Sequence, residues 1–282
     1  MSTGAGRLVV CPTPIGNLED VTLRVLSALR EADVIACEDT RRTSTLLDRY
    51  GVAAELVSYH EHNEERRAAE LVERLISGQT VALVSDAGMP LVSDPGFELV
   101  RACVAAGIQV EVLPGPSAVL AALVASALPS DRWRFTGFLP RKRGELRRVL
   151  EEADVTLVAF ESPRRLGTTL AVLAEIDPER PAAVCRELTK LHEEVARGTA
   201  GELAVRYSEA PPRGEIVLVV GPPPAGTSRA GAIAVDAVRR LVESGARPRP
   251  AAKVVAELTG EKSNRLYDSL TTTDRPPPVI DQ

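Results

Sequence analysis

Short apolar runs alternate with amphipathic segments from residue 8 to residue 128, and this alternation restricts the fold more than any other feature of the sequence. The runs, which we expect to be strands, are residues 8–11, 34–37, 56–59, 81–85 and 110–113. The segments after them, which we expect to be helices, are residues 21–30, 40–50, 64–77, 97–106 and 118–128. Such alternation predicts a parallel sheet with crossover helices on its faces. Because only 3% of the residues are aromatic, the core has to be built from alanine, valine and leucine.

A second block of expected strands follows, and its pattern differs from that of the first. These strands are residues 134–138, 156–160, 182–186, 194–197 and 215–220. The last three follow one another with fewer helices between them, which predicts a mixed sheet and a second α/β domain.

Beyond this block, a proline-rich linker at residues 222–226 leads to three short expected helices. They are residues 232–243, 251–258 and 262–270, and their spacing favours a small helix-turn-helix bundle. We therefore expect an α/β protein with domains at residues 1–117 and 118–225, a helical unit at 230–272 and a disordered tail at 273–282.

The composition indicates a cytoplasmic protein without a membrane span. The longest apolar stretch, residues 118–128, is too short to cross a bilayer, and the first residues do not resemble an export signal. The four cysteines are scattered without metal-ligand spacing, as expected of reduced, buried thiols. The formal net charge of −5 counts against a sequence-blind polyanion binder but leaves room for a local basic site.

Three loops that follow expected strands carry residues suited to binding a ligand. The loop at residues 12–17 has neither a Rossmann glycine motif nor a Walker lysine, and a tight strand-to-helix turn explains it equally well. The loop at residues 85–96 ends in an aspartate–proline helix start, whereas Asp86 and Gly88 at the strand's tip have no such explanation. The loop at residues 113–118 places small residues at a helix start, where backbone N–H groups can approach a ligand.

Together with four further segments, these loops resemble the tetrapyrrole methylase superfamily of S-adenosylmethionine enzymes, and within it the branch that methylates ribosomal RNA. The further segments are residues 38–43, 60–64, 160–165 and 214–217. The resemblance runs from about residue 8 to residue 270, and seven segments in the right order make it specific. It implies two α/β domains with the cofactor in the cleft between them, and it favours a homodimer.

The resemblance also implies which residues bind S-adenosylmethionine. From the first domain they are Pro14, Gly16, Asp86, Ala87, Gly88, Ser117 and Ala118, and from the second domain Phe160 and Leu188. Ala87 and Gly88 would contact the cofactor mainly through their backbone, which suits small side chains.

The implied reaction is 2′-O-methylation of a cytidine ribose in 16S ribosomal RNA, with the RNA or the small ribosomal subunit as partner. The residues that would contact RNA are Asn63, Arg41, Arg42, Arg141, Lys142, Arg143, Arg164 and Arg165. Each cation could equally be an ordinary solvated surface charge. Arg164 and Arg165, however, directly follow a serine–proline helix start, where cations oppose the helix dipole, and a nearby RNA backbone would give them a purpose.

Methyl transfer to a hydroxyl needs a group that accepts the proton, and four carboxylates are candidates for this general base. They are Asp39, Glu61, Asp94 and Glu161, and the sequence does not choose among them. His60 and His62 could share a face, but no third ligand accompanies them and the reaction needs no metal, so we expect no metal site.

The residues alone leave two other functions open. A methyltransferase that acts on a small tetrapyrrole precursor would share the cofactor loops, and its arginines could bind carboxylates. A non-catalytic nucleic-acid binder would leave the cofactor cleft without a role. The C-terminal helices, which carry Lys253, Lys262 and Arg265, are equally compatible with an RNA contact and with packing in a dimer.

Overall fold

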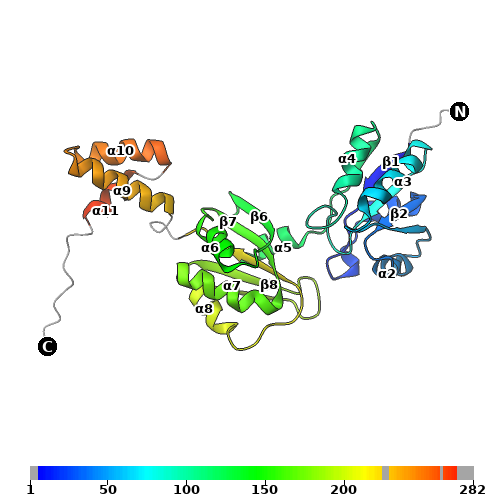
Figure 1. Ribbon diagram of the computed structural model, residues 1–282. Coiled ribbons are helices and arrows are strands. Elements are labelled where there is room, and N and C mark those ends of the chain that lie inside the picture. The colour runs from blue at the N-terminus through cyan, green and yellow to red at the C-terminus, as the bar shows by residue number, and fades with distance from the viewer. Residues whose placement is uncertain (1–5, 224–228, 261–262, 272–282) are drawn as a thin grey trace.

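The first domain is a parallel sheet with helices on both faces. The computed structural model describes residues 6–223, 229–260 and 263–271. The strands of the first sheet are β1 (Arg7–Val10), β2 (Val34–Cys37), β3 (Glu55–Ser58), β4 (Val81–Val84) and β5 (Gln109–Val112). They pair in the order β3-β2-β4-β1-β5, and every neighbouring pair is parallel, which confirms the expectation from the sequence (Figure 1).

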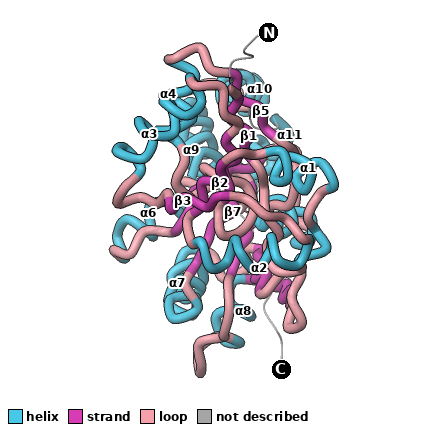
Figure 2. The backbone as a smooth tube through the Cα atoms, turned by 90° about the vertical axis from the view of Figure 1, so that its right-hand side faces the viewer, coloured by secondary structure: helices cyan, strands magenta, loops and turns pink. Residues whose placement is uncertain are grey.

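Helices α1 (Leu23–Glu31) and α2 (Thr40–Tyr50) cover one face of this sheet, and α3 (Glu64–Ile76) and α4 (Phe97–Ala105) cover the other (Figure 2). A short 3-10 helix, Leu18–Asp20, precedes α1. Strand β4 is buried along its whole length, which explains why its sequence is apolar throughout instead of alternating. Because β4, β1 and β5 are neighbours, the loops at their carboxyl ends lie together at one edge of the sheet.

The second domain is built on a mixed sheet, as the sequence predicted. Its strands are β6 (Trp133–Phe138), β7 (Thr156–Glu161), β8 (Pro181–Arg186), β9 (Glu194–Thr199) and β10 (Ile216–Val220), in the order β6-β7-β10-β8-β9. Strands β6 and β7 are parallel, and the other neighbouring pairs are antiparallel. Helix α5 (Ala118–Ser126) packs on this second sheet, so the chain passes from one domain to the other between Leu113 and Ala118.

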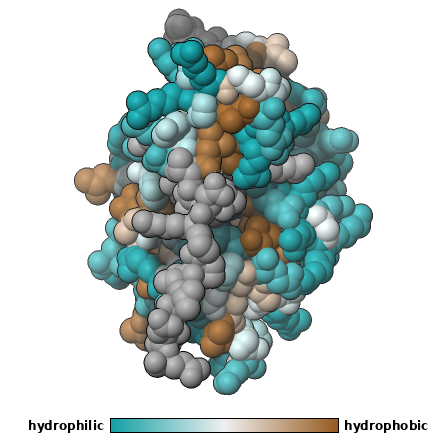
Figure 3. Space-filling view, turned by 90° about the vertical axis from the view of Figure 1, so that its left-hand side faces the viewer, coloured by the Kyte–Doolittle hydropathy of each residue, from teal (hydrophilic) through white to brown (hydrophobic). Residues whose placement is uncertain are grey.

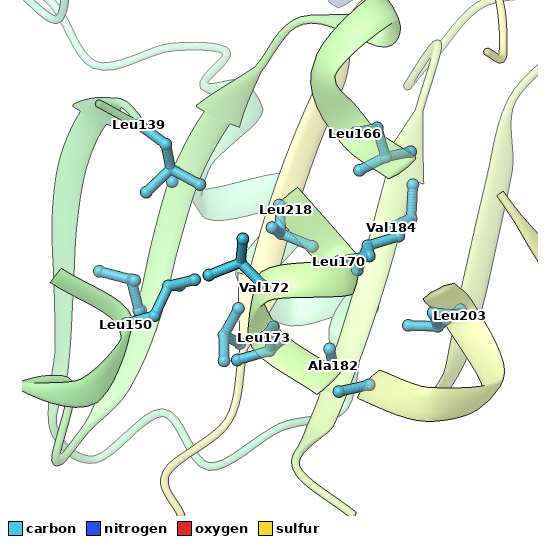
Figure 4. Close-up of a cluster of buried hydrophobic side chains, with 14 of the residues drawn as sticks. Leu139, Leu150, Leu166, Leu170, Val172, Leu173, Ala182, Val184, Leu203 and Leu218 are labelled. Atoms are coloured by element: carbon cyan, nitrogen blue, oxygen red, sulfur yellow. The ribbon is translucent and has the colours of Figure 1, made fainter. Parts of the chain in front are cut away.

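The opposite face of the second sheet is covered by three helices, of which the sequence analysis recognised only the start of one, at Ser162 and Pro163. They are α6 (Arg143–Glu151), α7 (Pro163–Ile176) and α8 (Ala200–Arg206). Leucines of α7, among them Leu166 and Leu170, pack against Val184 and Leu218 of the sheet (Figure 4). One face of the sheet therefore packs against α6, α7 and α8, and the other faces α5 and the first domain.

The C-terminal helices α9 (Arg229–Glu243), α10 (Pro248–Thr259) and α11 (Ser263–Thr271) form a bundle with a core of its own. Val238, Ala252 and Leu266 are among the residues buried between them. Figure 1 shows the bundle at the far end of the molecule from the first domain, and Figure 3 shows hydrophobic residues among hydrophilic ones on that end. The predicted disordered tail, residues 273–282, lies outside the described residues. Among the described helices, none is long and apolar enough to cross a membrane.

Candidate functional site

A cavity of about 440 Å³ lies between the two domains, within the size range of ligand pockets. The loops after β1, β4 and β5 form its wall on the side of the first domain, because these three strands are neighbours in the sheet. Residues at the ends of β6, β7 and β8 and at the start of β10 form the wall on the side of the second domain. The wall is largely apolar, and its carboxylates are Asp94, Glu161 and Glu215.

The structure brings most of the expected cofactor residues to this cavity. Those that line it are Ala87, Gly88, Ser117, Ala118, Phe160 and Leu188. Pro14, Gly16 and Asp86 are not among the lining residues of the described chain. Gly16 instead contacts the second domain, and Asp86 joins the ends of two neighbouring strands.

Two of the loops from the first domain are joined by a short backbone bridge. The N–H of Thr13 donates to the carbonyl of Gly88 over 2.8 Å, and the N–H of Gly88 donates back over 2.9 Å. The hydroxyl of Thr13 also donates to the carbonyl of Ser85 at 3.0 Å. Gly88 has a φ of 79°, and a Cβ there would lie 3.4 Å from Cγ2 of Ile15. A glycine at this position therefore suits the left-handed backbone, whereas the space would also admit a Cβ in ordinary contact with Ile15.

Gly16 lies at a close contact between the first domain and the second. A Cβ at Gly16 would lie 2.5 Å from Cγ of Lys190 and 2.7 Å from Oγ1 of Thr189. The neighbouring N–H, that of Asn17, donates to the same Thr189 oxygen at 3.0 Å. Thr189 lies in the turn after β8, directly after the cavity residue Leu188, and has a φ of 66°. Gly16 thus positions one wall of the cavity against the other.

Asp86 ties two neighbouring strand ends together. Its carboxylate accepts a hydrogen bond from the N–H of Asp39 at 3.0 Å and pairs with Arg42 at 3.4 Å. Asp39 and Arg42 follow β2, whereas Asp86 follows β4. The acidic residue that the sequence singled out therefore stabilises the edge of the sheet from which the cavity loops extend.

The four candidate bases lie in different surroundings, and Asp94 alone combines a place in the cavity wall with a raised pKa. Burial, with a contribution from the nearby Glu38, raises the pKa of Asp94 to about 6. Asp39 instead caps α2, and hydrogen bonds from the Arg41 side chain and N–H lower its pKa to about 2. Glu61 is exposed and does not line the cavity.

Glu161 lines the cavity, but its carboxylate is fully buried and already hydrogen-bonded. It accepts from the N–H of Ser162 at 2.7 Å and from the hydroxyl of Thr169 at 2.5 Å, and it pairs with Arg165 at 3.4 Å. These contacts fix the start of α7 beside the cavity. A carboxylate with this many partners holds the protein in shape and is poorly placed to take a proton from a substrate.

Most of the expected RNA-binding residues are engaged within the protein. Arg41 pairs with Asp39 at 2.7 Å, Arg42 with Asp86, Lys142 with Glu145 at 3.2 Å, and Arg143 with Glu175 at 2.6 Å. Arg165 donates to the carbonyls of Leu139 at 3.0 Å and Pro140 at 2.6 Å. The side chain of Asn63 accepts from the N–H of His60 at 2.9 Å and donates to the carbonyl of Ser58, so it supports the turn before α3.

Arg141 and Arg164 differ from these residues. Both are exposed, and neither forms a hydrogen bond or an ion pair within the described ranges. Arg165 links the start of α7, where Arg164 lies, to the segment before Arg141, because its guanidinium donates to the carbonyls of residues 139 and 140. Both arginines are close in the chain to lining residues of the cavity: Arg164 directly follows Ser162 and Pro163, and Arg141 lies three residues after Phe138.

His60 and His62 lie next to each other just before α3. Their rings meet edge to face with centroids 5.9 Å apart. No group of three potential metal ligands occurs in the part of the chain that the structure describes.

The sequence analysis missed Phe138, which lines the cavity and is 64% exposed. The available signal was Gly137, because a glycine inside an expected strand often marks a bulge. The structure shows such an irregularity: the register of β6 against β7 shifts between Phe135 and Phe138, and Gly137 has a φ of 64°.

Residues 7–204 match the family of Tetrapyrrole (Corrin/Porphyrin) Methylases, which covers more than half of the chain. The chain belongs to this family. Membership makes it a methyltransferase of the class that uses S-adenosylmethionine as the methyl donor.

Similar proteins with curated names, and similar solved structures, share much of the chain's length. The chain is 48% identical over 271 residues to "Ribosomal RNA small subunit methyltransferase I" of Mesorhizobium japonicum, which covers 93% of this chain and 90% of that protein. A Thermotoga maritima protein of the same name is 45% identical over 217 residues, 76% of this chain and 98% of that protein. Among solved structures, uroporphyrin-III-C-methyltransferase from Thermus thermophilus matches with a TM-score of 0.55 and 27% identity, over 77% of this chain and 94% of that chain.

Proposed function

We propose that this protein transfers a methyl group from S-adenosylmethionine to the 2′-hydroxyl of a cytidine ribose in 16S ribosomal RNA. Relatives named for methylation of small-subunit ribosomal RNA match nearly the whole chain. Two features together carry the proposal. Asp94 lies in the cavity wall, and Arg141 and Arg164, which form no ion pair within the described residues, lie close in the chain to residues that line the cavity. A hydroxyl on a polyanionic chain needs both a proton acceptor and groups that hold phosphate. This function would place the protein with ribosomes in the cytoplasm.

The cavity suits the cofactor because small residues let the backbone approach it. Ala87, Gly88, Ser117 and Ala118 would hold S-adenosylmethionine from the first domain, and Phe160 and Leu188 would cover it from the second. The cofactor supplies a methyl group already activated on a sulfonium. The protein's task is to orient the ribose oxygen toward that methyl group and to exclude water.

Asp94 is the general base in this proposal. With a pKa of about 6, its carboxylate is mostly deprotonated at neutral pH and still basic enough to accept a proton as the hydroxyl attacks. Glu161 is a positioning residue, since its hydrogen bonds hold the start of α7 and, through Arg165, the segment before Arg141.

The test is methyl transfer to small ribosomal subunits purified from cells that lack this protein, followed by mass mapping of their 16S RNA. We expect one new ribose methyl on a cytidine and none on a tetrapyrrole acceptor. Asp94→Asn should lower kcat by about 10²–10⁴-fold and leave the cofactor Kd nearly unchanged. Glu98→Gln is the control, because Glu98 pairs with Arg101 on α4 and does not line the cavity. Transfer to a tetrapyrrole and not to RNA would refute the proposed function.

We also propose that the protein acts as a homodimer. Helix α5 packs one side on the second sheet, yet Leu120 and Val124 on its outer side are 52% and 81% exposed. Val112 on the edge strand β5 is 58% exposed as well. Light scattering should report a dimer that the double substitution Leu120→Glu, Val124→Glu converts to a monomer. Val205→Glu, at a 75% exposed position on α8, should leave it dimeric.

A further inference from the structure

Phe138 is a large apolar side chain in the wall of the cavity, but 64% of it remains exposed. Its ring lies 5.5 Å from that of Phe160, and Phe160 in turn meets Phe135 edge to face at 5.1 Å. The three rings form an aromatic row, in which Phe135 and Phe160 are partly buried and Phe138 is exposed. The inner rings hold Phe138 in place, so its free face is rigid and available to a ligand.

The bulge in β6 is what brings Phe138 to this position. Side chains alternate between the two faces of a strand, so Phe135 and Phe138, three residues apart, would ordinarily point to opposite faces. In β6, Phe135 is opposite Val158 and Phe138 is opposite Phe160, so three steps on β6 match two steps on β7. The extra residue turns both phenylalanines to the same face, which is the face of the cavity.

The surroundings of Phe138 are those of a surface for single-stranded RNA. Two residues after Phe138, Pro140 is held by Arg165, and Arg141 follows it with an unpaired guanidinium. Arg164, the other unpaired cation, stands at the start of α7 beside the cavity. Proteins that bind single strands combine cations for the phosphates with aromatic rings on which bases stack.

We propose that Phe138 is the platform on which the base of the target nucleotide stacks, while Arg141 and Arg164 hold the phosphates on either side. This inference rests on the proposed function. A nucleotide whose ribose enters the cavity loses stacking contacts with its neighbours in the RNA, and the face of Phe138 replaces the stacking that is lost. Because Phe138 lies at the mouth and not at the bottom of the cavity, it contacts the nucleotide and not the cofactor.

Substitutions at Phe138 test the proposal in methyl transfer to small ribosomal subunits that lack the modification. Phe138→Ala should lower kcat/KM by about tenfold to a hundredfold, the range measured for loss of one base–aromatic stack. Phe138→Leu should lower it similarly, because leucine keeps the apolar bulk but has no ring. Phe138→Trp should retain activity. The Kd for S-adenosylhomocysteine, measured by calorimetry, should stay within about twofold of wild type in all three variants.

Phe97→Ala is the matched control, since Phe97 is 61% exposed and does not line the cavity. Its kcat/KM should equal that of the wild type. A loss of cofactor affinity in Phe138→Ala as large as its loss of kcat/KM would overturn the proposal, because Phe138 would then hold the cofactor. Wild-type activity in Phe138→Leu would overturn it too, since no stacking would be needed. A wild-type enzyme that methylates no ribosomal RNA would instead refute the proposed function.

Discussion

Replacing Gly16 by alanine tests whether the two domains are fitted against each other at the cavity. The added Cβ would lie 2.5 Å from Cγ of Lys190 and 3.0 Å from the carbonyl oxygen of Leu188. Carbon atoms in ordinary contact are about 3.5–4.0 Å apart, so the turn at residues 187–190 has to retreat by about 1 Å. Lys190 cannot easily move aside, because its Nζ is held by Glu187 and Glu215, each at 2.9 Å.

Overpacking of this kind costs about 1–3 kcal/mol. Since Leu188 belongs both to the displaced turn and to the cavity wall, part of this cost should appear as weaker cofactor binding. We expect the Kd for S-adenosylhomocysteine to rise about tenfold, which corresponds to about 1.4 kcal/mol, and the melting temperature to fall. Calorimetry and thermal denaturation measure the two effects.

Gly144→Ala is the control, because Gly144 lies in α6 and a Cβ there would have no neighbour within 4 Å. In a Lys190→Ala background, which removes the closest contact, Gly16→Ala should cost measurably less than in the wild type. If Gly16→Ala left both the cofactor affinity and the melting temperature unchanged, the idea that this glycine sets the distance between the domains would be wrong.

The charges of Asp94, Arg141 and Arg164 and the separate core of α9–α11 lead to four further predictions. Because protonated Asp94 cannot accept a proton, kcat should fall as the pH drops below about 6, and Asp94→Asn should lose this dependence. Since the folded-state pKa of Asp94 is raised from 3.8, its charge costs stability above pH 6, so Asp94→Asn should raise the melting temperature at pH 7.5, with a gain that fades toward pH 4. Replacing Arg141 and Arg164 by glutamine should weaken binding to small subunits and reduce the slope of log K against log salt by about 1 per arginine, whereas Arg147→Gln, whose side chain already pairs with Glu151, should change the slope little. Deleting residues 229–282 should leave cofactor binding and the melting temperature of the remaining protein unchanged, because α9–α11 have their own core and the Thermotoga maritima relative matches only 76% of this chain; a lower melting temperature would show that the bundle supports the domains.

The first sheet was predictable because buried parallel strands are apolar along their whole length, as β2 and β4 are. The loops at residues 85–96 and 113–118 were expected to converge because the carboxyl ends of parallel strands lie at one edge of the sheet. The helices of the second domain were harder to find. Helix α6 has only nine residues, most of them charged, and its buried residues are Leu146 and Leu150.

The roles of single residues in the cavity were less predictable than its location. Asp86 stands at a strand's tip, where a ligand contact is expected, but its oxygens meet the N–H of Asp39 and the guanidinium of Arg42. Gly16 meets the turn after β8, which is more than 170 residues away in the sequence. Contacts between residues so far apart depend on how the two domains pack, and short-range sequence patterns do not predict that packing.

The single extra residue in β6 has a consequence for how a cavity of this kind can evolve. Losing Gly137 would restore the regular register against β7 and leave Phe138, then two residues after Phe135, on the same face of the sheet. Straightening the strand without losing a residue would instead turn the ring of Phe138 toward the side of the sheet that α6 and α7 cover. A substitution at Gly137 that favours a regular strand, where φ is now 64°, could therefore remove the aromatic surface, whereas deletion of the extra residue would keep it. The gain or loss of a bulge in an edge strand can in this way change which acceptor an enzyme takes while its donor pocket stays intact.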